Sequence, residues 1–317
     1  MAAAGRGPQY NESEARLFFA YARASFCLGP VIQRWDCGSV CTEAPVAPGS
    51  PRYLGPGARF GVQGYAALLP AGAEEGPGRR CVAAFRGTQP FNLRNMLADW
   101  MVLPAPWPAG GAAWCPDCQV HRGFAGAFED LRPALLGALR ELGCGSVALA
   151  GHSLGAAVAT LAAMELRGLG VRVDAVWTYG KPRLGNAAFA RAFAAAAERQ
   201  GVEPPLWRVV HYHDVVPRAN LYSFPWAPRH EPLEVYYPTE DSATYRVCES
   251  SPEHLENPSC MWATPVSEWA YSDHMKYLRV DFALPPVCGF GPDAPGQLLL
   301  AGLALAAAAA AAWRCSR

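Results

Sequence analysis

The stretch Ser146-Val-Ala-Leu-Ala-Gly-His-Ser-Leu-Gly-Ala-Ala-Val-Ala-Thr-Leu-Ala-Ala-Met-Glu-Leu166 decides the fold of this chain. Its first five residues, 146–150, form a short apolar run without a helical period, which predicts a buried strand. Residues 154–166 are rich in Ala and long enough for a helix. Between them lies Gly151-His-Ser-Leu-Gly155, so the chain turns sharply from a strand into a helix.

The same alternation of strand and helix continues on both sides of this stretch. Apolar runs predict strands over 60–68, 81–86, 173–179 and 206–211, and patterns of helical length or period predict helices over 12–27, 123–142 and 186–199. Strands that alternate with helices of this length favour βαβ units and a mostly parallel sheet with helices on both faces, the α/β class. We expect one domain over 10–290, followed by an Ala/Leu-rich tail over 291–317.

The composition is that of a globular protein. Hydrophobic residues make up 51% of the 317 residues and charged residues 17%, far from the low hydropathy and high charge of disordered chains. Lys plus Arg equals Asp plus Glu at 27 each, so no net positive field attracts a phosphate backbone over long range. We therefore expect no nucleic-acid partner.

Eleven cysteines are scattered along the chain. A structural zinc site needs two close pairs of ligands, and only Cys115-Pro-Asp-Cys118 has such spacing. The short loops Cys37 to Cys41 and Cys248 to Cys260 are typical of loops closed by disulfides. We favour disulfides, no metal, and a secreted protein or another oxidising compartment, although no signal peptide is visible in residues 1–10.

The C-terminal tail has two interpretations. Residues 298–313 are almost wholly Leu and Ala, and 16 helical residues reach about 24 Å, short of the roughly 30 Å hydrocarbon core of a bilayer. The tail is therefore either an Ala-rich low-complexity or packed segment, or a membrane or GPI-type attachment signal.

Ser153, at the centre of Gly151-His-Ser-Leu-Gly155, is the candidate nucleophile. The pattern G-x-S-x-G is weak by itself, but a strand before it and a helix after it are typical of a nucleophile elbow. Glycines on both sides let the neighbouring backbone pass close to the turn. The alternative is a serine that merely caps the following helix.

A serine hydroxyl needs an adjacent base, and histidine is the side chain whose pKa suits this task. In enzymes with such an elbow the chain order is nucleophile, acid, base. This order leaves His230, His254 and His274 as bases, and we favour His274, which follows a short predicted helix. Asp214 directly follows a predicted strand, at the end where open α/β sheets place their sites. The alternatives are a solvated loop histidine and a turn-capping aspartate.

An oxyanion that forms at Ser153 needs two preset N–H donors. The first is the backbone N–H of Leu154, directly after the nucleophile. The second should come from Phe85-Arg-Gly-Thr88, which ends an earlier strand. An ordinary strand-ending turn is the alternative for this segment.

Several motifs in a fixed order resemble the class 3 lipase family, the filamentous-fungal triacylglycerol lipases, which have the α/β-hydrolase fold. The resemblance covers most of the chain, and its motifs are Trp35-Asp-Cys37, the run FRGT at 85–88, Ala98-Asp-Trp100, His121-Arg-Gly-Phe124, Gly151-His-Ser-Leu-Gly155, Tyr179-Gly-Lys-Pro-Arg-Leu-Gly185, His213-Asp-Val-Val-Pro217 and Asp273-His274. The chain departs from the family in Cys115-Pro-Asp-Cys118, in a Trp/Pro-rich loop at 103–114 and in its tail.

The resemblance implies roles for particular residues. Ser153, Asp214 and His274 look like the catalytic triad, and Thr88 with Leu154 like the oxyanion pair. It also implies the disulfides Cys27–Cys288, Cys37–Cys41 and Cys248–Cys260, and the close pair Cys115–Cys118 is a further candidate.

Family members carry a short amphipathic lid between the FRGT and ADW segments. Here this position holds Phe91-Asn-Leu-Arg-Asn-Met-Leu97, whose apolar residues are Phe91, Leu93, Met96 and Leu97. A closed lid buries its apolar side, and a lipid surface stabilises the open state by accepting it. Packing of the same residues into the core is the alternative.

We therefore expect a secreted, monomeric lipase that needs no cofactor and acts on acylglycerols or other lipid esters at a lipid–water interface. Phospholipase, galactolipase or feruloyl esterase activity on the same machinery is the alternative. A more remote one is a lipid-binding protein whose hydrolase site is silent.

Overall fold

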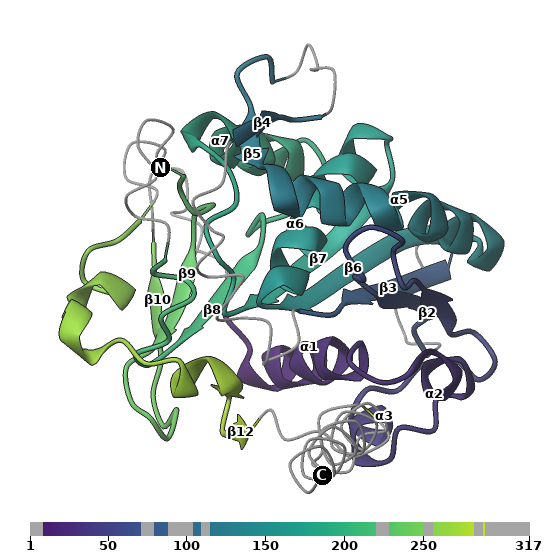
Figure 1. Ribbon diagram of the computed structural model, residues 1–317, viewed down its shortest axis with the longest axis horizontal. Helices are drawn as coiled ribbons and strands as arrows, with labels where there is room; N and C mark the ends of the chain where they lie inside the picture. The colour runs from purple at the N-terminus through teal and green to yellow at the C-terminus, as the bar shows by residue number, and fades with distance from the viewer. Residues whose placement is uncertain are drawn as a thin grey trace, which may run out of the picture.

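A computed structural model describes residues 9–70, 79–87, 104–108, 115–219, 228–249, 256–281 and 288 (Figure 1). Within these residues an eight-stranded sheet forms the centre of the molecule. Its spatial order is β1 (Arg52–Leu54), β2 (Gly64–Leu68), β3 (Arg79–Phe85), β6 (Cys144–His152), β7 (Arg172–Tyr179), β8 (Trp207–His211), β9 (Glu234–Tyr237) and β10 (Arg246–Cys248).

The middle of the sheet is parallel and its edges are antiparallel. Strands β3, β6, β7, β8 and β9 run parallel to one another. Strands β1, β2 and β10 pair antiparallel. The predicted α/β class with a mostly parallel sheet is thus confirmed.

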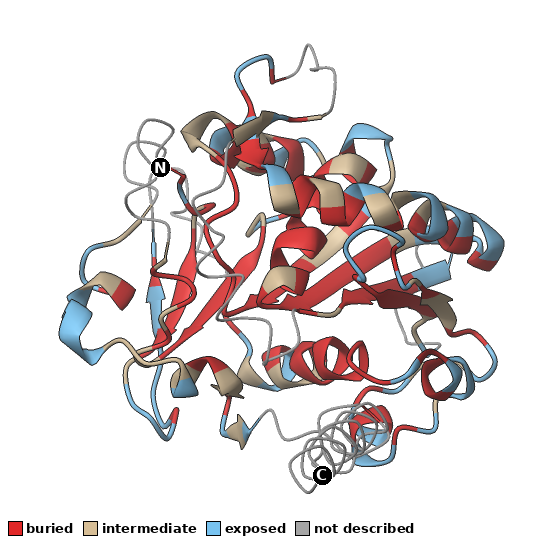
Figure 2. Ribbon diagram, in the orientation of Figure 1, coloured by how far each residue is buried: buried red, intermediate tan, exposed pale blue. Residues whose placement is uncertain are grey.

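Helices cover both faces of this sheet. They are α1 (Glu12–Ala24), α2 (Gly29–Arg34), α3 (Ser39–Glu43), α5 (Arg122–Leu142), α6 (Leu154–Gly168) and α7 (Ala187–Glu198). Figure 1 shows α1 on one side of the strands and α5, α6 and α7 on the other. The central strands are therefore buried on both faces (Figure 2).

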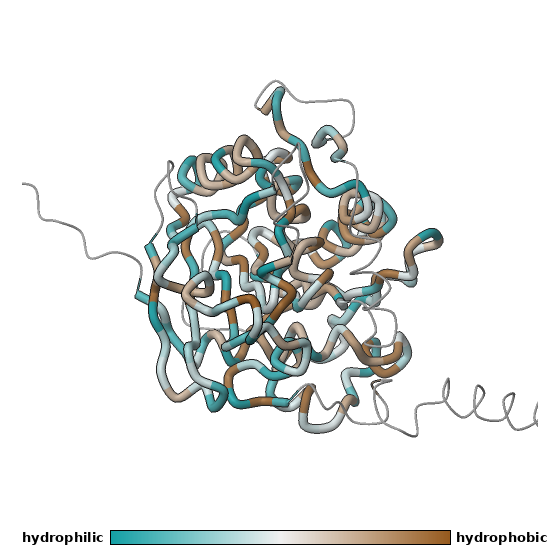
Figure 3. The backbone as a smooth tube through the Cα atoms, turned by 60° about the vertical axis from the view of Figure 1, so that its left-hand side comes forward, coloured by the Kyte–Doolittle hydropathy of each residue, from teal (hydrophilic) through white to brown (hydrophobic). Residues whose placement is uncertain are grey.

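Alternate residues of β3 show how both faces are filled. Val82 and Ala84 belong to the core against α1, whereas Ala83 and Phe85 belong to the core against α5 and α6. This double burial explains why the strand has a continuous apolar sequence without polar alternation. The hydropathy-coloured tube shows the same arrangement, with hydrophobic segments in the interior (Figure 3).

Two predicted boundaries were wrong. The strand expected over 60–68 begins only at Gly64, because residues 57–61 form a turn in which the Gly57 N–H donates to the Val62 carbonyl (2.7 Å). The helix expected over 12–27 ends at Ala24, where the Ser25 hydroxyl donates to the Ala22 carbonyl (2.6 Å). Its start is as expected, since Asn11 Oδ1 accepts from the N–H groups of Ser13 and Glu14.

Short elements complete the described chain. They are the two-stranded pairs β4 (Pro104–Pro106) with β5 (Gln119–His121) and β11 (Lys276–Tyr277) with β12 (Val280–Asp281), and the 3₁₀ turns η1 (Met261–Ala263), η2 (Val266–Glu268) and η3 (Ser272–Met275). The last of these turns carries His274.

Ten of the cysteines form disulfides in the structure. The pairs are Cys27–Cys288, Cys37–Cys41, Cys81–Cys144, Cys115–Cys118 and Cys248–Cys260. Four of these pairs are those named from the sequence. The fifth, Cys81–Cys144, joins the neighbouring strands β3 and β6 and was not predicted.

The predicted tail at 291–317 lies outside the described residues, and the single domain over 10–290 remains a prediction. Of the helices in the described ranges, none has the length and apolar character to cross a membrane.

Candidate active site

Ser153 lies at the turn between β6 and α6. Its backbone has φ 57° and ψ −128°, a conformation that non-glycine residues rarely adopt and that is typical of strained turns at functional sites. The residue occupies the N-cap position of α6, yet its side chain makes no capping hydrogen bond to this helix. Capping therefore does not account for a serine here.

Two glycines allow this turn to form. A Cβ on Gly155 would lie 2.0 Å from the Phe85 carbonyl oxygen, and a Cβ on Gly151 would lie 2.2 Å from the Gly155 oxygen. The first turn of α6 is thus in direct backbone contact with the end of β3, at a distance that no side chain permits. This contact fixes Ser153 beside the residues that follow β3.

His274 and Asp214 form a buried hydrogen-bonded pair. The distance from His274 Nδ1 to Asp214 Oδ2 is 2.8 Å, and both side chains are fully buried. Residues 60 apart in the sequence are brought together by a parallel bridge between Asp214 and Ala270. His274 is therefore not a solvated loop histidine, and with Nδ1 as the donor its Nε2 is left as the basic nitrogen.

The carboxylate of Asp214 is held in its ionised form. Burial by itself would raise its pKa, but His274, the Tyr277 hydroxyl and the Val216 N–H all act in the opposite direction, and the pKa lies below its usual value. The Val216 N–H donates to Oδ1 (2.8 Å), and the Tyr277 hydroxyl donates to Oδ2. Asp214 thus caps a turn and also accepts from His274, and it stays charged at neutral pH.

His152 connects the serine turn to the histidine turn. Its Nε2 lies 2.9 Å from the His274 carbonyl oxygen, and the two imidazole rings have centroids 4.5 Å apart. Burial lowers the pKa of His152 well below its usual range, so the ring is neutral. The neighbour of Ser153 therefore packs directly against His274.

Two polar atoms remain unpaired at this junction. Within the described ranges, Ser153 Oγ and His274 Nε2 are both buried and have no hydrogen-bond partner. A buried polar atom without a partner is costly, and such atoms concentrate where a substrate or catalytic step uses them.

Other histidines have structural partners instead. His121 Nδ1 accepts from the Phe124 N–H at the start of α5 (3.3 Å), and His211 Nδ1 lies 3.1 Å from the Ser242 hydroxyl. His230, one of the alternative bases, is buried with Nε2 2.8 Å from the Pro217 carbonyl. The remaining alternative, His254, lies outside the described residues.

Part of the predicted site also falls outside the described ranges. The site residues outside the described ranges are Thr88 and the lid residues Phe91, Leu93, Met96 and Leu97. Gly87, directly before Thr88, is described, and a Cβ on it would lie 3.0 Å from Ser153 Cβ. Leu154 follows Ser153 as the first residue of α6.

Two residues that lie against the Asp214–His274 pair, Gly180 and Tyr277, were not predicted from the sequence. Gly180 has φ 58°, and a Cβ there would lie 2.7 Å from His274 Cε1 and 2.9 Å from Asp214 Oδ2. Its signal was its place in Tyr179-Gly-Lys-Pro-Arg-Leu-Gly185, where we gave it no role. Tyr277 lies three residues beyond His274, and nothing in the sequence marks its hydroxyl as a partner of Asp214.

Comparisons with known proteins find lipases. Residues 82–224 match the family model described as "Lipase (class 3)". The secreted mono- and diacylglycerol lipase A of Penicillium camembertii is 32% identical over 167 residues, which cover 51% of this chain and 50% of that protein. The lipase of Rhizomucor miehei is 29% identical over 209 residues, covering 63% of this chain and 52% of that protein. The chain thus spans about half the length of these curated relatives.

Solved structures share the fold. The triacylglyceride lipase of Rhizomucor miehei aligns with a TM-score of 0.68 at 23% identity, covering 89% of this chain and 99% of that one. The Lip2 lipase of Yarrowia lipolytica gives a TM-score of 0.68 at 22% identity, with coverage of 89% and 99%. The fold is that of an α/β-hydrolase. The chain is thus similar to class 3 lipases over residues 82–224, and to the two curated lipases over 51% and 63% of its length.

Proposed function

We propose that this protein is a lipase that hydrolyses carboxylic esters of acylglycerols, with Ser153 as nucleophile, His274 as general base and Asp214 as the residue that orients the base. The observation that carries the proposal is the buried hydrogen bond of 2.8 Å between His274 Nδ1 and Asp214 Oδ2, at a histidine that packs against the turn holding Ser153. Relatives named as mono- and diacylglycerol lipases support the substrate class.

In this mechanism His274 Nε2 accepts the proton of Ser153 as Oγ attacks the ester carbonyl carbon. The tetrahedral intermediate collapses, the alcohol leaves with the proton from His274, and an acyl-enzyme forms. Water then attacks the acyl group with the same histidine as base, which releases the fatty acid. Asp214 stays ionised and stabilises the imidazolium at each proton transfer.

Two features favour stabilisation of the oxyanion beside Ser153. Leu154 begins α6, so its N–H belongs to the unsatisfied donors at the positive end of a 15-residue helix. The close approach of Gly87 to Ser153 supports Thr88 as the second donor, as the resemblance implies. We propose Thr88 and Leu154 as the oxyanion pair.

We also propose that Phe91, Leu93, Met96 and Leu97 form a lid that opens at a lipid–water interface. The apolar pattern of this segment and the similarity to class 3 lipases support this role. Five disulfides in the structure, together with relatives that are named as secreted, support a secreted protein in an oxidising compartment.

An activity panel tests the proposal. Triglycerides, diglycerides, phospholipids, galactolipids and aryl esters are assayed above and below their solubility limits with the wild type and with Ser153→Ala. We expect acylglycerol turnover that falls at least about 10⁴-fold in Ser153→Ala, while the thermal midpoint and binding to lipid emulsions are unchanged. Acylglycerol turnover retained by Ser153→Ala would refute the proposed mechanism. Binding without turnover in the wild type would favour a silent lipid-binding protein.

A further inference from the structure

Arg218 is a fully buried arginine in the turn that follows the candidate acid, Asp214. Arginine is almost never fully buried without partners, so its contacts indicate its task. Nη1 donates to the carbonyl oxygen of Asp214 (2.6 Å), and Nη2 donates to that of Tyr212 (2.7 Å). One side of the guanidinium therefore binds the backbone on both sides of His213, within the turn that presents the acid.

The other side of the guanidinium binds the segment that leads to His274. Nε donates to the Met261 carbonyl (3.0 Å), and Nη2 donates to Thr264 Oγ1 (3.0 Å). From Thr264 the chain continues to Ala270, whose N–H donates to the His213 carbonyl (2.9 Å). Arg218 thus joins the two chain segments that supply the acid and the base.

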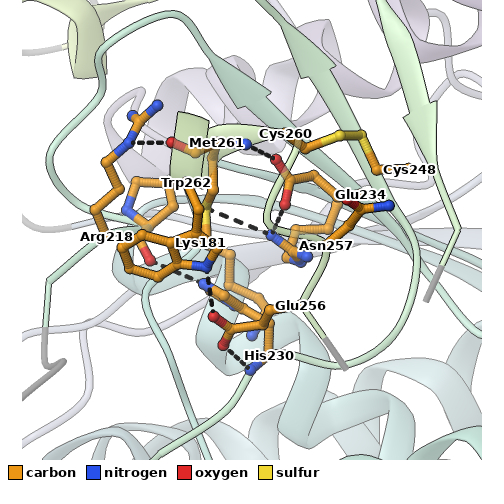
Figure 4. A network of polar contacts seen from close by, with 12 residues as sticks. Lys181, Arg218, His230, Glu234, Cys248, Glu256, Asn257, Cys260, Met261 and Trp262 are labelled. Carbon is orange, nitrogen blue, oxygen red and sulfur yellow. Dashed lines mark hydrogen bonds and ion pairs between the residues drawn. A yellow bond between two sulfur atoms is a disulfide. The ribbon is translucent and has the colours of Figure 1, made fainter. Parts of the chain in front are cut away.

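A layer of buried charges holds the Met261 segment in turn (Figure 4). Glu234 Oε1 accepts from the Met261 N–H (2.9 Å), while Glu234 Oε2 pairs with Arg208 (3.1 Å). The disulfide Cys248–Cys260 fixes the residue directly before Met261.

Arg183 also binds the turn that contains Arg218. Its Nη1 donates to the carbonyl oxygens of Arg218 (3.2 Å) and Ala219 (3.1 Å), and its guanidinium pairs with Glu256 (2.5 Å). Glu256 also accepts from the Trp262 indole N–H (2.8 Å) and from the backbone N–H of His230 (3.0 Å). Arg183 and Glu256 therefore connect the turn at residues 218 and 219 to the segment that contains Trp262.

Arg218 differs from the other cations near this network in its partners. Among the described residues that form it, the cations are Lys181, Arg183, Arg208 and Arg218, and the glutamates are Glu231, Glu234 and Glu256. Lys181 pairs with Glu231, Arg183 with Glu256 and Arg208 with Glu234. Arg218 forms no such ion pair within the described ranges and donates instead to the backbone carbonyl oxygen of Asp214.

We propose that Arg218 is a positioning residue for catalysis: it sets the distance and orientation of Asp214 relative to His274 by binding both of their chain segments at once. The inference rests on the proposed function, since it assigns a task within the same site. A lysine cannot replace this residue fully, because an ammonium group lacks the planar fork that serves four acceptors in two directions.

Three variants test this role. Arg218→Met removes all four hydrogen bonds, and Arg218→Lys keeps the charge with fewer donors. Arg167→Met is the matched control, because Arg167 is a buried arginine of α6 whose guanidinium donates to the Pro205 carbonyl (3.1 Å) and lies over the Phe193 ring, away from the acid and the base.

Turnover of a soluble aryl ester is measured per site titrated with a phosphonate, well below the thermal midpoint of each variant. We expect kcat to fall about 100-fold in Arg218→Met and about 10-fold in Arg218→Lys with KM within twofold, because a displaced catalytic group loses rate and not affinity. Arg167→Met should keep kcat within twofold even if its thermal midpoint falls equally. If Arg218→Met does not fold, Arg218→Lys decides.

A second measurement does not depend on ester turnover. The proton between His274 Nδ1 and Asp214 should give a far-downfield proton NMR resonance that disappears in His274→Gln. We expect it to shift or broaden in both Arg218 variants and to stay in place in Arg167→Met. A phosphonate that never reacts with the wild type would refute the proposed function only. Arg218→Lys with kcat within twofold of the wild type and an unmoved resonance would overturn the positioning role.

Discussion

The two halves of the candidate active site are built in different ways. On the serine side, β6, α6 and the end of β3 meet through backbone contacts so close that Gly151 and Gly155 cannot carry a Cβ without a collision. On the acid and base side, Asp214 and His274 are held by buried charges and hydrogen bonds from loops that follow β8 and β10. Close packing of small residues fixes the proposed nucleophile, whereas a polar network fixes its proposed partners.

Because of this difference, substitutions in the two halves should have different effects on folding and on turnover. A packed backbone contact has no room to adjust, so its loss should affect folding first. A polar network can lose one hydrogen bond and keep the fold, so its loss should affect the chemistry first. Variants that separate folding from turnover therefore test whether the two halves differ in this way.

The largest effect on stability should come from the serine side. Gly155→Ala places a Cβ 2.0 Å from the Phe85 carbonyl oxygen, within backbone that cannot move away. We expect the free energy of unfolding to fall by about 4 kcal/mol, measured by urea denaturation. Gly137→Ala is the control, since this exposed glycine of α5 has nothing within 4 Å of a built Cβ. It should gain roughly 0.5 to 1 kcal/mol. Equal stability of the two variants would refute the close-packing account.

A smaller loss of stability is expected when the pH is lowered. Burial lowers the pKa of His121 and of His211 to about 4, and it lowers those of His152 and His230 well below their usual range. The unfolded chain takes up these protons near pH 6.5, whereas in the folded protein His121 and His211 do so only near pH 4. Stability is therefore complete above about pH 6.5 and is lost as the pH falls toward 4, by up to about 3 kcal/mol for His121.

His121→Asn tests how much one of these histidines contributes to the loss of stability in acid. Asparagine keeps a cap acceptor for the Phe124 N–H but does not titrate in this range. The thermal midpoint, scanned from pH 7 to 4.5, should fall less steeply with acid in the variant than in the wild type. Parallel curves would show that His121 contributes nothing to acid sensitivity.

The smallest effect should come from one hydroxyl in the polar half. Tyr277→Phe removes a hydrogen bond to Asp214. Since this bond favours the ionised carboxylate, its loss should raise the pKa of Asp214 and lower kcat roughly 3- to 10-fold. Tyr179→Phe is the control, because it removes a buried hydroxyl that donates to the Ala15 carbonyl instead (2.5 Å). Equal kcat values for the two variants would show that the Tyr277 hydroxyl has no special role.

The same contrast explains what the sequence predicted. The strand and helix around Ser153 follow from local periodicity, because burial on both faces gives β6 a continuous apolar run. The antiparallel strands β1 and β10 were missed because three residues are too few for a period. Cys81–Cys144 was missed because it depends on which distant strands become neighbours.

The polar half was predictable only in part. Asp214 and His274 could be chosen from chain order and from the family motifs, but their supports could not. Arg183, Arg218 and Glu256 lie in loops, where charged residues are ordinarily solvated, and no spacing in the sequence indicates that the two arginines are buried or that Glu256 pairs with Arg183. The partners of the Arg183 side chain lie 35 to 73 residues away along the chain.

The proposed catalysis requires that His274 activate Ser153, and covalent labelling of Ser153 measures this activation. The protein is treated with a fluorophosphonate in the presence of a lipid emulsion, and the modified peptide is identified by mass spectrometry. We predict a single label on Ser153 in the wild type, no label in Ser153→Ala, and a labelling rate at least about 10³-fold lower in His274→Ala. A label on another residue, or an unchanged rate in His274→Ala, would contradict the account.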